Sequence, residues 1–250
     1  MSRGTLWFVV PALNEAENLP TLTRALAAAC AQHEELFHLI LVDDGSDDGT
    51  GDVVRAALPG RSTVLRHETN RGPGAAMRTG FLHAIEVAGP EDLVVTLEAD
   101  GTSDLEILPA LTTLARVGFD VALASPHAVG GGIEGTTLTR IAISGGANLL
   151  CRLVLGIRGV NTYSSFYRVH TAEILRRLFA RYGDATIEEW GFSYAVEMLT
   201  KLQRTGARVC EVPMHLDATQ RIGVSRMKIL PTTVGYLRLF ARLGPWRRRR

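Results

Sequence analysis

The stretch FHLILVDDGSDDGT, residues 37–50, joins an apolar run to a cluster of acidic and turn-forming residues. Residues 37–42 are a short, mostly apolar run, which predicts a buried strand. The aspartates and glycines that follow predict a turn at its end. The pattern returns further along, where the apolar run of residues 93–97 leads directly into Glu98-Ala99-Asp100. Acidic side chains therefore follow two predicted strands at the point where each strand ends.

Strand and helix signals alternate along the first 125 residues. The predicted strands cover residues 6–10, 37–42, 62–67, 93–97 and 121–124. The predicted helices cover residues 14–32, with Asn14 as N-cap, then 51–58, the segment from the NRGPG loop to residue 85, and 107–117. This alternation predicts an α/β fold with a Rossmann-like, mostly parallel central sheet flanked by helices. Ligands of such sheets bind beyond the carboxyl ends of the strands, where the acidic residues fall.

The pattern is looser after residue 125. Residues 127–135, HAVGGGIEG, are a glycine-rich candidate for an active-site loop. Helices are predicted over residues 139–155, 172–180 and 192–202, and a strand over 208–212. Since no run of 18 uncharged apolar residues occurs, we expect no transmembrane helix. We expect a main domain over residues 1–228 and a basic, partly apolar C-terminal helix or tail over 229–250.

Charge and cysteine content limit the class of protein. The net charge is +1, but residues 218–250 carry nine cations and no acid, against 18 cations and 26 acids in the rest. A basic end on an acidic body indicates an anionic partner, such as a membrane surface, a nucleic acid or a phosphorylated substrate, or else a solvated tail. The three cysteines form no CxxC pair, and the N-terminus lacks a signal peptide. We therefore expect a cytoplasmic protein, either free or peripheral on the cytoplasmic face of the membrane.

Two acidic motifs suggest a nucleotide and a metal. Asp43 and Asp44 can accept hydrogen bonds from a base N–H and a ribose hydroxyl, although the same turn could instead cap the next helix. Glu98 and Asp100 lie on one side of an extended segment. Such paired carboxylates suit Mg²⁺ or Mn²⁺ carrying a diphosphate, the alternative being two solvated acids in a loop.

Other motifs carry less information. NRGPG, residues 70–74, precedes a helix but is neither GxGxxG nor a Walker motif, and Arg71 could reach a phosphate or lie on the surface. The seven histidines lack metal-ligand spacing, and no serine has a GxSxG context. Nucleic-acid binding is not expected, because no aromatic-rich basic face accompanies the cations.

Taken in order, the motifs resemble inverting family 2 glycosyltransferases, specifically the branch of dolichol- or polyprenol-phosphate mannose synthases. The resemblance covers nearly the whole chain. The motifs that carry it are VVPALNEAENL (9–19), LVDDGSDDGT (41–50), NRGPGAAMRTGF (70–81), LEADGTSD (97–104), Arg140 with Ser144 and Asn148, NTYSSFYR (161–168), GFSYAVEML (191–199), EVPM (211–214) and GVSRMK (223–228).

The resemblance implies a GT-A fold, a divalent metal, and transfer of a hexose from GDP-mannose or a UDP-hexose to a lipid phosphate with inversion. It implies nucleotide-sugar binding by Pro11, Asn14, Glu15, Asp43, Asp44, Arg71, Gly72, Glu98, Ala99 and Asp100. Glu98 and Asp100 would hold the metal, and Asp100, Arg140 and Glu197 would act in catalysis. The acceptor or its phosphate would contact Ser125, Arg140, Ser144, Arg221, Ser225 and Arg226. The basic C-terminus could then rest on an anionic leaflet.

Departures from the branch fall mostly on the acceptor side. Glu98 replaces the usual first Asp of the metal motif and has a longer side chain. On the acceptor side the departures are Pro126 and Tyr167 for Arg, Asn161 for Asp, Arg226 for Lys, and Arg221 offset by one position. A soluble hydroxyl acceptor therefore stays open, in which case Glu188, Glu189 or Glu197 would supply a base. A non-catalytic nucleotide-sugar-binding module is the other alternative.

Overall fold

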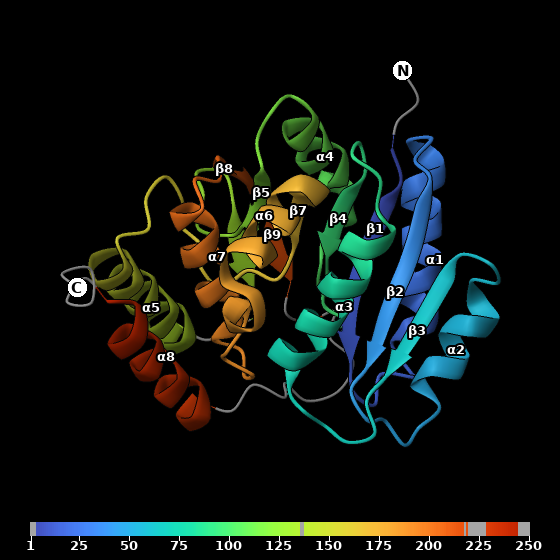
Figure 1. Ribbon diagram of the computed structural model, residues 1–250, viewed down its shortest axis with the longest axis horizontal. Coiled ribbons are helices and arrows are strands. Elements are labelled where there is room, and N and C mark those ends of the chain that lie inside the picture. Colours follow the sequence, from blue (N-terminus) through green and yellow to red (C-terminus); the bar gives the residue numbers. More distant parts are fainter. Residues whose placement is uncertain (1–3, 136–137, 218, 220–228, 245–250) are drawn as a thin grey trace.

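The computed structural model of the protein describes residues 4–135, 138–217, 219 and 229–244, without the side chains of residues 138–144 and 229–230. Its first half alternates strands and helices (Figure 1). The strands are β1 (Leu6–Ala12), β2 (Phe37–Asp43), β3 (Ser62–Arg66) and β4 (Leu93–Thr96). The helices are α1 (Leu19–Gln32), α2 (Thr50–Ala57), α3 (Pro73–Val87) and α4 (Leu108–Arg116), the last preceded by the 3₁₀ turn η1 (Leu105–Ile107).

The second half completes the sheet and adds helices at its far end. Its strands are β5 (Val121–Ser125), β6 (Gly132–Glu134), β7 (Arg168–Thr171), β8 (Val209–Pro213) and β9 (His215–Asp217). Its helices are α5 (Leu138–Leu155), α6 (Ala172–Tyr182), the 3₁₀ turn η2 (Gly183–Thr186), α7 (Tyr194–Arg204) and α8 (Ile229–Leu243).

Seven strands form one central sheet in the order β3-β2-β1-β4-β7-β5-β8, and β6 pairs with β9 beside it. All pairings in the central sheet are parallel except those of β7, which runs antiparallel to β4 and β5. The strand order reverses at β1, which has β2 on one side and β4 on the other. In open α/β sheets such a reversal opens a crevice beyond the strand ends. The loops after β1, β2 and β4 surround this position.

Helices cover both faces of the sheet, so the strands are buried on both sides. Alternate residues of β1 point to opposite faces: Phe8 packs in the cluster that includes α1, α2 and α4, whereas Val9 packs in the cluster that includes α3, α6 and α7. In Figure 1, α3, α6 and α7 lie in front of the sheet. The prediction of a mostly parallel sheet with helices on both faces is therefore confirmed.

Helices α5 and α8 lie side by side at one end of the molecule (Figure 1). Cys151 and Leu155 of α5 join Leu239 of α8 in an apolar cluster with Val196 and Leu199 of α7. The described part of α8 thus packs on the main fold through a side chain that is 0% exposed, Leu239. No helix within the described residues has the length and apolar character needed to cross a membrane.

Two expectations about the elements are wrong in detail. The first helix begins at Leu19, with Asn18 as its N-cap, because Asn14 has a φ of 50° and lies in a turn outside the helix. Strands β6, β7 and β9 were not predicted, and β6 lies within residues 127–135, which were expected to form a loop. Asp48 does bond the amide of Thr50 at the start of α2, at 2.9 Å, so part of the acidic turn serves the helix.

Candidate active site

Asp43, the last residue of β2, places a buried carboxylate at the carboxyl end of the sheet. Its Oδ1 accepts a hydrogen bond from the Ser46 amide at 2.8 Å. Its Oδ2 lies 3.4 Å from the Arg66 guanidinium but accepts no hydrogen bond from any described residue. A buried carboxylate oxygen is costly to leave unbonded. Asp43 therefore keeps an acceptor that an N–H group of a ligand could satisfy.

Asp44 is equally buried, but its carboxylate is already occupied by the protein. Its Oδ1 accepts hydrogen bonds from His67 Nδ1 at 2.6 Å and from the Arg71 amide at 3.0 Å. Its Oδ2 accepts the Gly72 amide at 2.7 Å. Asp44 thereby fixes the backbone of the NRGPG loop, which is a different task from the direct nucleoside contact expected for it.

The loop after β1 is tied to the loop after β2. The Asn14 amide donates to Ser46 Oγ at 2.8 Å, and the Glu15 amide donates to Thr50 Oγ1 at 2.9 Å. Pro11 stands opposite Val42 in the register of β1 and β2. These bonds bring the segment that holds Pro11, Asn14 and Glu15 to the same strand ends as Asp43.

The NRGPG loop packs against a turn that lies far away in the sequence. The Gly74 amide donates to the Trp190 carbonyl at 2.8 Å. A Cβ at Gly72 would lie 2.5 Å from that carbonyl oxygen, and a Cβ at Gly74 would overlap the carbonyl of Glu189. The glycines are thus required for close backbone contact. The Arg71 guanidinium lies 5.6 Å from the centroid of the exposed Trp190 ring.

Glu98 and Asp100 follow β4 as predicted, with Ala99 buried between them. Asp100 Oδ1 accepts the amide of Thr102 at 3.1 Å and its hydroxyl at 2.7 Å, which fixes the carboxylate. Two hard oxygen donors fit Mg²⁺ or Mn²⁺ if diphosphate oxygens complete the coordination shell. Within the described residues no group of three or more His, Cys, Asp or Glu side chains could hold a metal by itself.

A cavity of about 150 Å³ opens beside Glu98. Hydroxyl groups form much of its wall, and aromatic and aliphatic side chains form the rest. Its remaining lining residues are Thr102, Ser103, Pro126, His127, Ile133, Thr162, Ser164, Ser165, Phe166, Tyr167, Met214 and Leu216. Small-molecule sites combine apolar walls with a few polar groups in this way.

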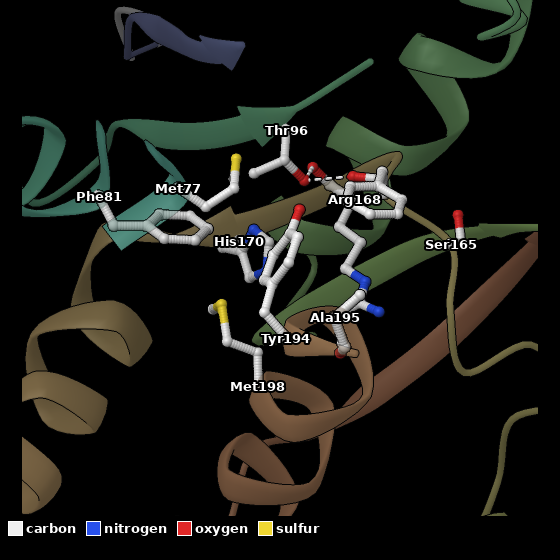
Figure 2. Close-up of a pocket in the computed structure, with 10 residues that line it drawn as sticks. Met77, Phe81, Thr96, Ser165, Arg168, His170, Tyr194, Ala195 and Met198 are labelled. Carbon is white, nitrogen blue, oxygen red and sulfur yellow. Dashed lines mark hydrogen bonds between the residues drawn. The ribbon is translucent and has the colours of Figure 1, made fainter. Parts of the chain in front are cut away.

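A buried polar cluster surrounds Arg168, which is 3% exposed (Figure 2). Its guanidinium donates to the carbonyls of Ala195 at 3.0 Å and Tyr163 at 2.9 Å. Burial lowers the pKa of Arg168 to about 10 and that of the neighbouring His170 to about 3. Together with Tyr194, whose pKa burial raises, they line a cavity of about 10 Å³, enough for about one water. This second cavity shares two wall residues with the larger one, Ser165 and Phe166.

Glu197 is not placed to act as the base that was predicted. It is 0% exposed, and its Oε1 pairs with Lys201 Nζ at 2.6 Å and Arg242 Nη2 at 2.8 Å. Its Oε2 accepts the amides of Glu188 and Glu189 at 3.0 and 2.8 Å. Both oxygens are engaged by the protein, and Glu197 does not line the cavity beside Glu98. Its observed contacts are with two cations and two backbone amides of the protein itself.

The residues predicted for the acceptor are only partly described. Ser125 is 0% exposed, and its hydroxyl bonds Thr162 Oγ1 at 2.6 Å, so it supports the cavity wall without facing the cavity. Arg140 and Ser144 belong to α5, but their side chains lie outside the described residues. Arg221, Ser225 and Arg226 lie outside the described residues altogether.

Sequence reasoning missed several residues that shape the site. His67 directly follows β3, and the same strand-end rule that singled out Asp43 could have found it. Ser46 and Thr50 lie inside the quoted acidic turn, and no role was predicted for them. Nothing in the sequence pattern indicated that Trp190 would meet the NRGPG loop, because that contact depends on how distant segments pack.

The profile of the family "Glycosyl transferase family 2" matches residues 7–183. The polyprenol monophosphomannose synthase of Mycolicibacterium smegmatis is 30% identical over 222 residues, which cover 88% of this chain and 79% of that protein. The undecaprenyl-phosphate mannosyltransferase of Micrococcus luteus is 32% identical over 221 residues, covering 88% and 86%. The resemblance noted from the motifs is thus confirmed.

A solved structure with the same fold is glucosyl-3-phosphoglycerate synthase from Mycobacterium tuberculosis, in complex with Mn²⁺, UDP and glucosyl-3-phosphoglycerate. It superposes with a TM-score of 0.65 over 96% of this chain and 78% of that chain, at 19% sequence identity. This likeness confirms the predicted GT-A fold. The match to the family profile and the two relatives establish the rest: the chain belongs to glycosyl transferase family 2 and is a glycosyltransferase.

Proposed function

We propose that this glycosyltransferase moves a hexosyl group from a nucleotide sugar to a polyprenyl phosphate, with inversion at the anomeric carbon. This chain aligns with most of the length of two relatives whose names refer to mannose and to polyprenol or undecaprenyl phosphate. GDP-mannose is therefore the first donor to test, and a UDP-hexose the second. The described donor-side residues and the cavity beside Glu98 support this reading.

The donor would bind across the reversal of strand order at β1. The buried, unbonded Oδ2 of Asp43 suits an N–H of the base, and the adjoining segment of Pro11, Asn14 and Glu15 suits the nucleoside. Arg71 and Gly72 would lie near the diphosphate. Glu98 and Asp100 would hold Mg²⁺ or Mn²⁺, which when bound supplies positive charge to the departing diphosphate. The cavity beside Glu98, with its many hydroxyl groups, suits the hexose.

One observation favours a phosphate as acceptor over a hydroxyl. A hydroxyl must lose a proton to a base as it attacks, and the three candidate glutamates do not line the cavity. Glu188 pairs with Lys201, Glu189 with Arg242, and Glu197 with both cations. A phosphate oxygen is already anionic near pH 7 and needs no base. It would attack the anomeric carbon from the side opposite the diphosphate, whose oxygen takes the electrons of the broken bond.

The acceptor phosphate would be held by the predicted cations Arg140, Arg221 and Arg226, with Ser144 and Ser225. Helices α5 and α8 would carry the protein onto an anionic membrane surface. On α5 three leucines are more than half exposed: Leu149, Leu150 and Leu153. On α8 Leu237 is 62% exposed, and the chain continues from α8 into a run of four arginines. Apolar side chains next to cations are typical of interfacial helices.

The proposal is tested by donor binding and product partition. In a thermal-shift panel with Mn²⁺, we expect GDP or UDP to raise the Tm and excess EDTA to remove the shift. With a labelled donor and a short prenyl phosphate, we expect label in the organic phase. Asp100→Asn should abolish transfer and the Mn²⁺-dependent shift, whereas Glu98→Asp should keep both, because either carboxylate can bind the metal.

The control is Glu106→Gln, which removes an exposed acid a few residues away and should change neither readout. Absence of a shift with every nucleoside diphosphate would contradict the proposal. Label that stays in the aqueous phase, bound to a hydroxyl compound, would support a soluble acceptor instead. Tight donor binding without transfer to any acceptor mixture would indicate a binding module.

A further inference from the structure

We propose that Arg242 of the C-terminal helix is a positioning residue for the donor site, acting through the turn of residues 188–190 on the NRGPG loop. The inference rests on the proposed function in one respect, namely that the NRGPG loop borders the bound nucleotide sugar. Its structural part concerns contacts between described residues and can be tested without any ligand. Three contacts in series carry it.

The first contact joins α8 to a buried acidic cluster. Arg242 Nη2 bonds Glu197 Oε1 at 2.8 Å and Glu189 Oε1 at 3.1 Å. The helix comes close at Gly235, where a Cβ would lie 2.5 Å from Ser193 Oγ and 3.4 Å from Glu189 Oε2. Burial raises the pKa of Glu189, while Arg242 opposes that shift. Arg242 thus supplies positive charge to carboxylates that are removed from water.

The second contact joins this cluster to the turn. Glu197 Oε2 accepts the backbone amides of Glu188 and Glu189. Lys201 bonds Glu197 Oε1, Glu188 Oε2 at 3.1 Å and the carbonyl of Ala185. Glu197 therefore holds the turn with one oxygen and shares the other between Lys201 and Arg242. If Arg242 is lost, Lys201 still pairs with Glu197, whereas Glu189 loses its ion pair and keeps only the charge of Arg238 nearby.

The third contact joins the turn to the donor-site loop. Trp190 accepts the Gly74 amide through its carbonyl, and its ring lies against Arg71. The opposite side of the loop is held by Asp44, which accepts the amides of Arg71 and Gly72. The loop is thus clamped between β2 and the turn. If the turn shifts, only the Asp44 half of the clamp stays in place.

Removing one partner of a buried ion pair leaves a charge that is expensive to keep out of water. In Arg242→Met we expect Glu189 to turn toward solvent and to draw the backbone of residues 188–190 with it. The bond from Gly74 to Trp190 then opens. The NRGPG loop should become mobile, although the substituted residue touches neither the loop nor the nucleotide.

The test measures hydrogen exchange of wild type, Arg242→Met, Arg242→Lys and the control Arg208→Met. Arg208 is an exposed arginine that pairs with Asp120 at 3.3 Å, away from the cluster. In Arg242→Met, exchange in peptides covering residues 70–76 and 185–192 should accelerate by roughly tenfold, within the range of site-to-site couplings. Exchange in α4 should stay unchanged. Arg242→Lys keeps the positive charge but not the planar guanidinium with its several donors. Its exchange rate should lie between those of wild type and Arg242→Met.

Binding of the nucleoside diphosphate is measured on the same proteins. Arg242→Met should raise its Kd and the donor KM by roughly tenfold and leave the acceptor KM within about twofold. Loop exchange as slow in Arg242→Met as in Arg208→Met would overturn the proposal, as would acceleration spread evenly over α4 and the loop. If Arg242→Met does not fold, Arg242→Gln takes its place with the same criteria. If wild type binds no nucleoside diphosphate, the proposed function fails, whereas the exchange result still decides the role of Arg242.

Discussion

Asp43 and Asp44 are neighbours in the chain, yet their carboxylates do different things. Asp44 accepts three hydrogen bonds from the protein, and Asp43 accepts one and keeps Oδ2 unbonded within the described structure. A carboxylate that is desolvated in advance binds a ligand N–H at little further cost, because the penalty of burial has already been met in folding. On the proposed function, Asp43 is therefore the residue on which base recognition depends most.

We expect Asp43→Asn to weaken nucleoside diphosphate binding by roughly ten- to a hundredfold, which is the value of a hydrogen bond to a charged group. The substitution keeps an oxygen for the Ser46 amide, so the fold should survive. Isothermal titration calorimetry on both proteins checks the prediction. Asp47→Asn, an exposed position in the same turn, is the matched control and should bind as wild type does. Equal affinities for Asp43→Asn and wild type would exclude Asp43 from the base site.

Much of the site was predictable because it follows from strand ends. Asp43 ends β2, Glu98 and Asp100 follow β4, and the parallel sheet brings such positions together without further information. The role of Glu197 was not predictable. A glutamate on a helix gives no sign of whether it faces a substrate or two cations, and its partners Lys201 and Arg242 are identified by packing alone.

At the scale of elements, the regular first half of the chain was easier to predict than the second. Apolar runs and turn residues located β1, β2, β3 and β4 to within a few residues. The antiparallel β7 has only four residues, and its place between β4 and β5 is set by pairing partners from distant parts of the sequence. The start of α1 was misplaced because Asn14 serves the loop contact with Ser46 instead of capping the helix.

The exposed leucines of α5 are expected to contact lipid. Leu150 and Leu153 are 52% and 69% exposed and lie about one turn apart. If this face enters the headgroup region of a membrane, Leu150→Glu with Leu153→Glu should weaken binding to anionic vesicles by at least roughly tenfold. Co-sedimentation with phosphatidylglycerol vesicles measures this.

The matched control is Leu36→Glu, because Leu36 is 67% exposed but lies between α1 and β2. It should leave vesicle binding unchanged. High salt should weaken the binding of wild type, since screening removes the contribution of the cations. Equal binding by the α5 variant and wild type would show that another surface meets the lipid.

At the scale of the whole molecule, the buried His170 should make stability depend on pH. Burial lowers its pKa to about 3, against about 6.5 in an unfolded chain. Between these values the unfolded state binds a proton that the folded state does not. The contribution of the buried, neutral His170 to stability is therefore fully present above about pH 6.5. As the pH falls toward 3, the free energy of unfolding decreases by up to about 1.4 kcal/mol per pH unit.

We expect His170→Gln to flatten the fall in unfolding free energy between about pH 6 and 4.5, since glutamine does not titrate. Urea denaturation at several pH values measures the slope in both proteins. His215→Gln removes an exposed histidine and should leave the slope unchanged. A slope in His170→Gln as steep as that of wild type would mean that His170 is reached by water and titrates in the folded protein.

The ion pairs between Arg242 and glutamates of the main fold limit how far this chain could be shortened. The composition predicts a domain boundary at residue 228, before the basic C-terminal segment. A chain cut there would retain all described strands of the sheet. Trimming there would delete the arginine that pairs with Glu188, Glu189 and Glu197 and would uncover the apolar surface on which Leu239 rests. We therefore expect shortened forms of the chain to fold only if they extend at least through residue 243. The arginines beyond that residue are not needed for these contacts.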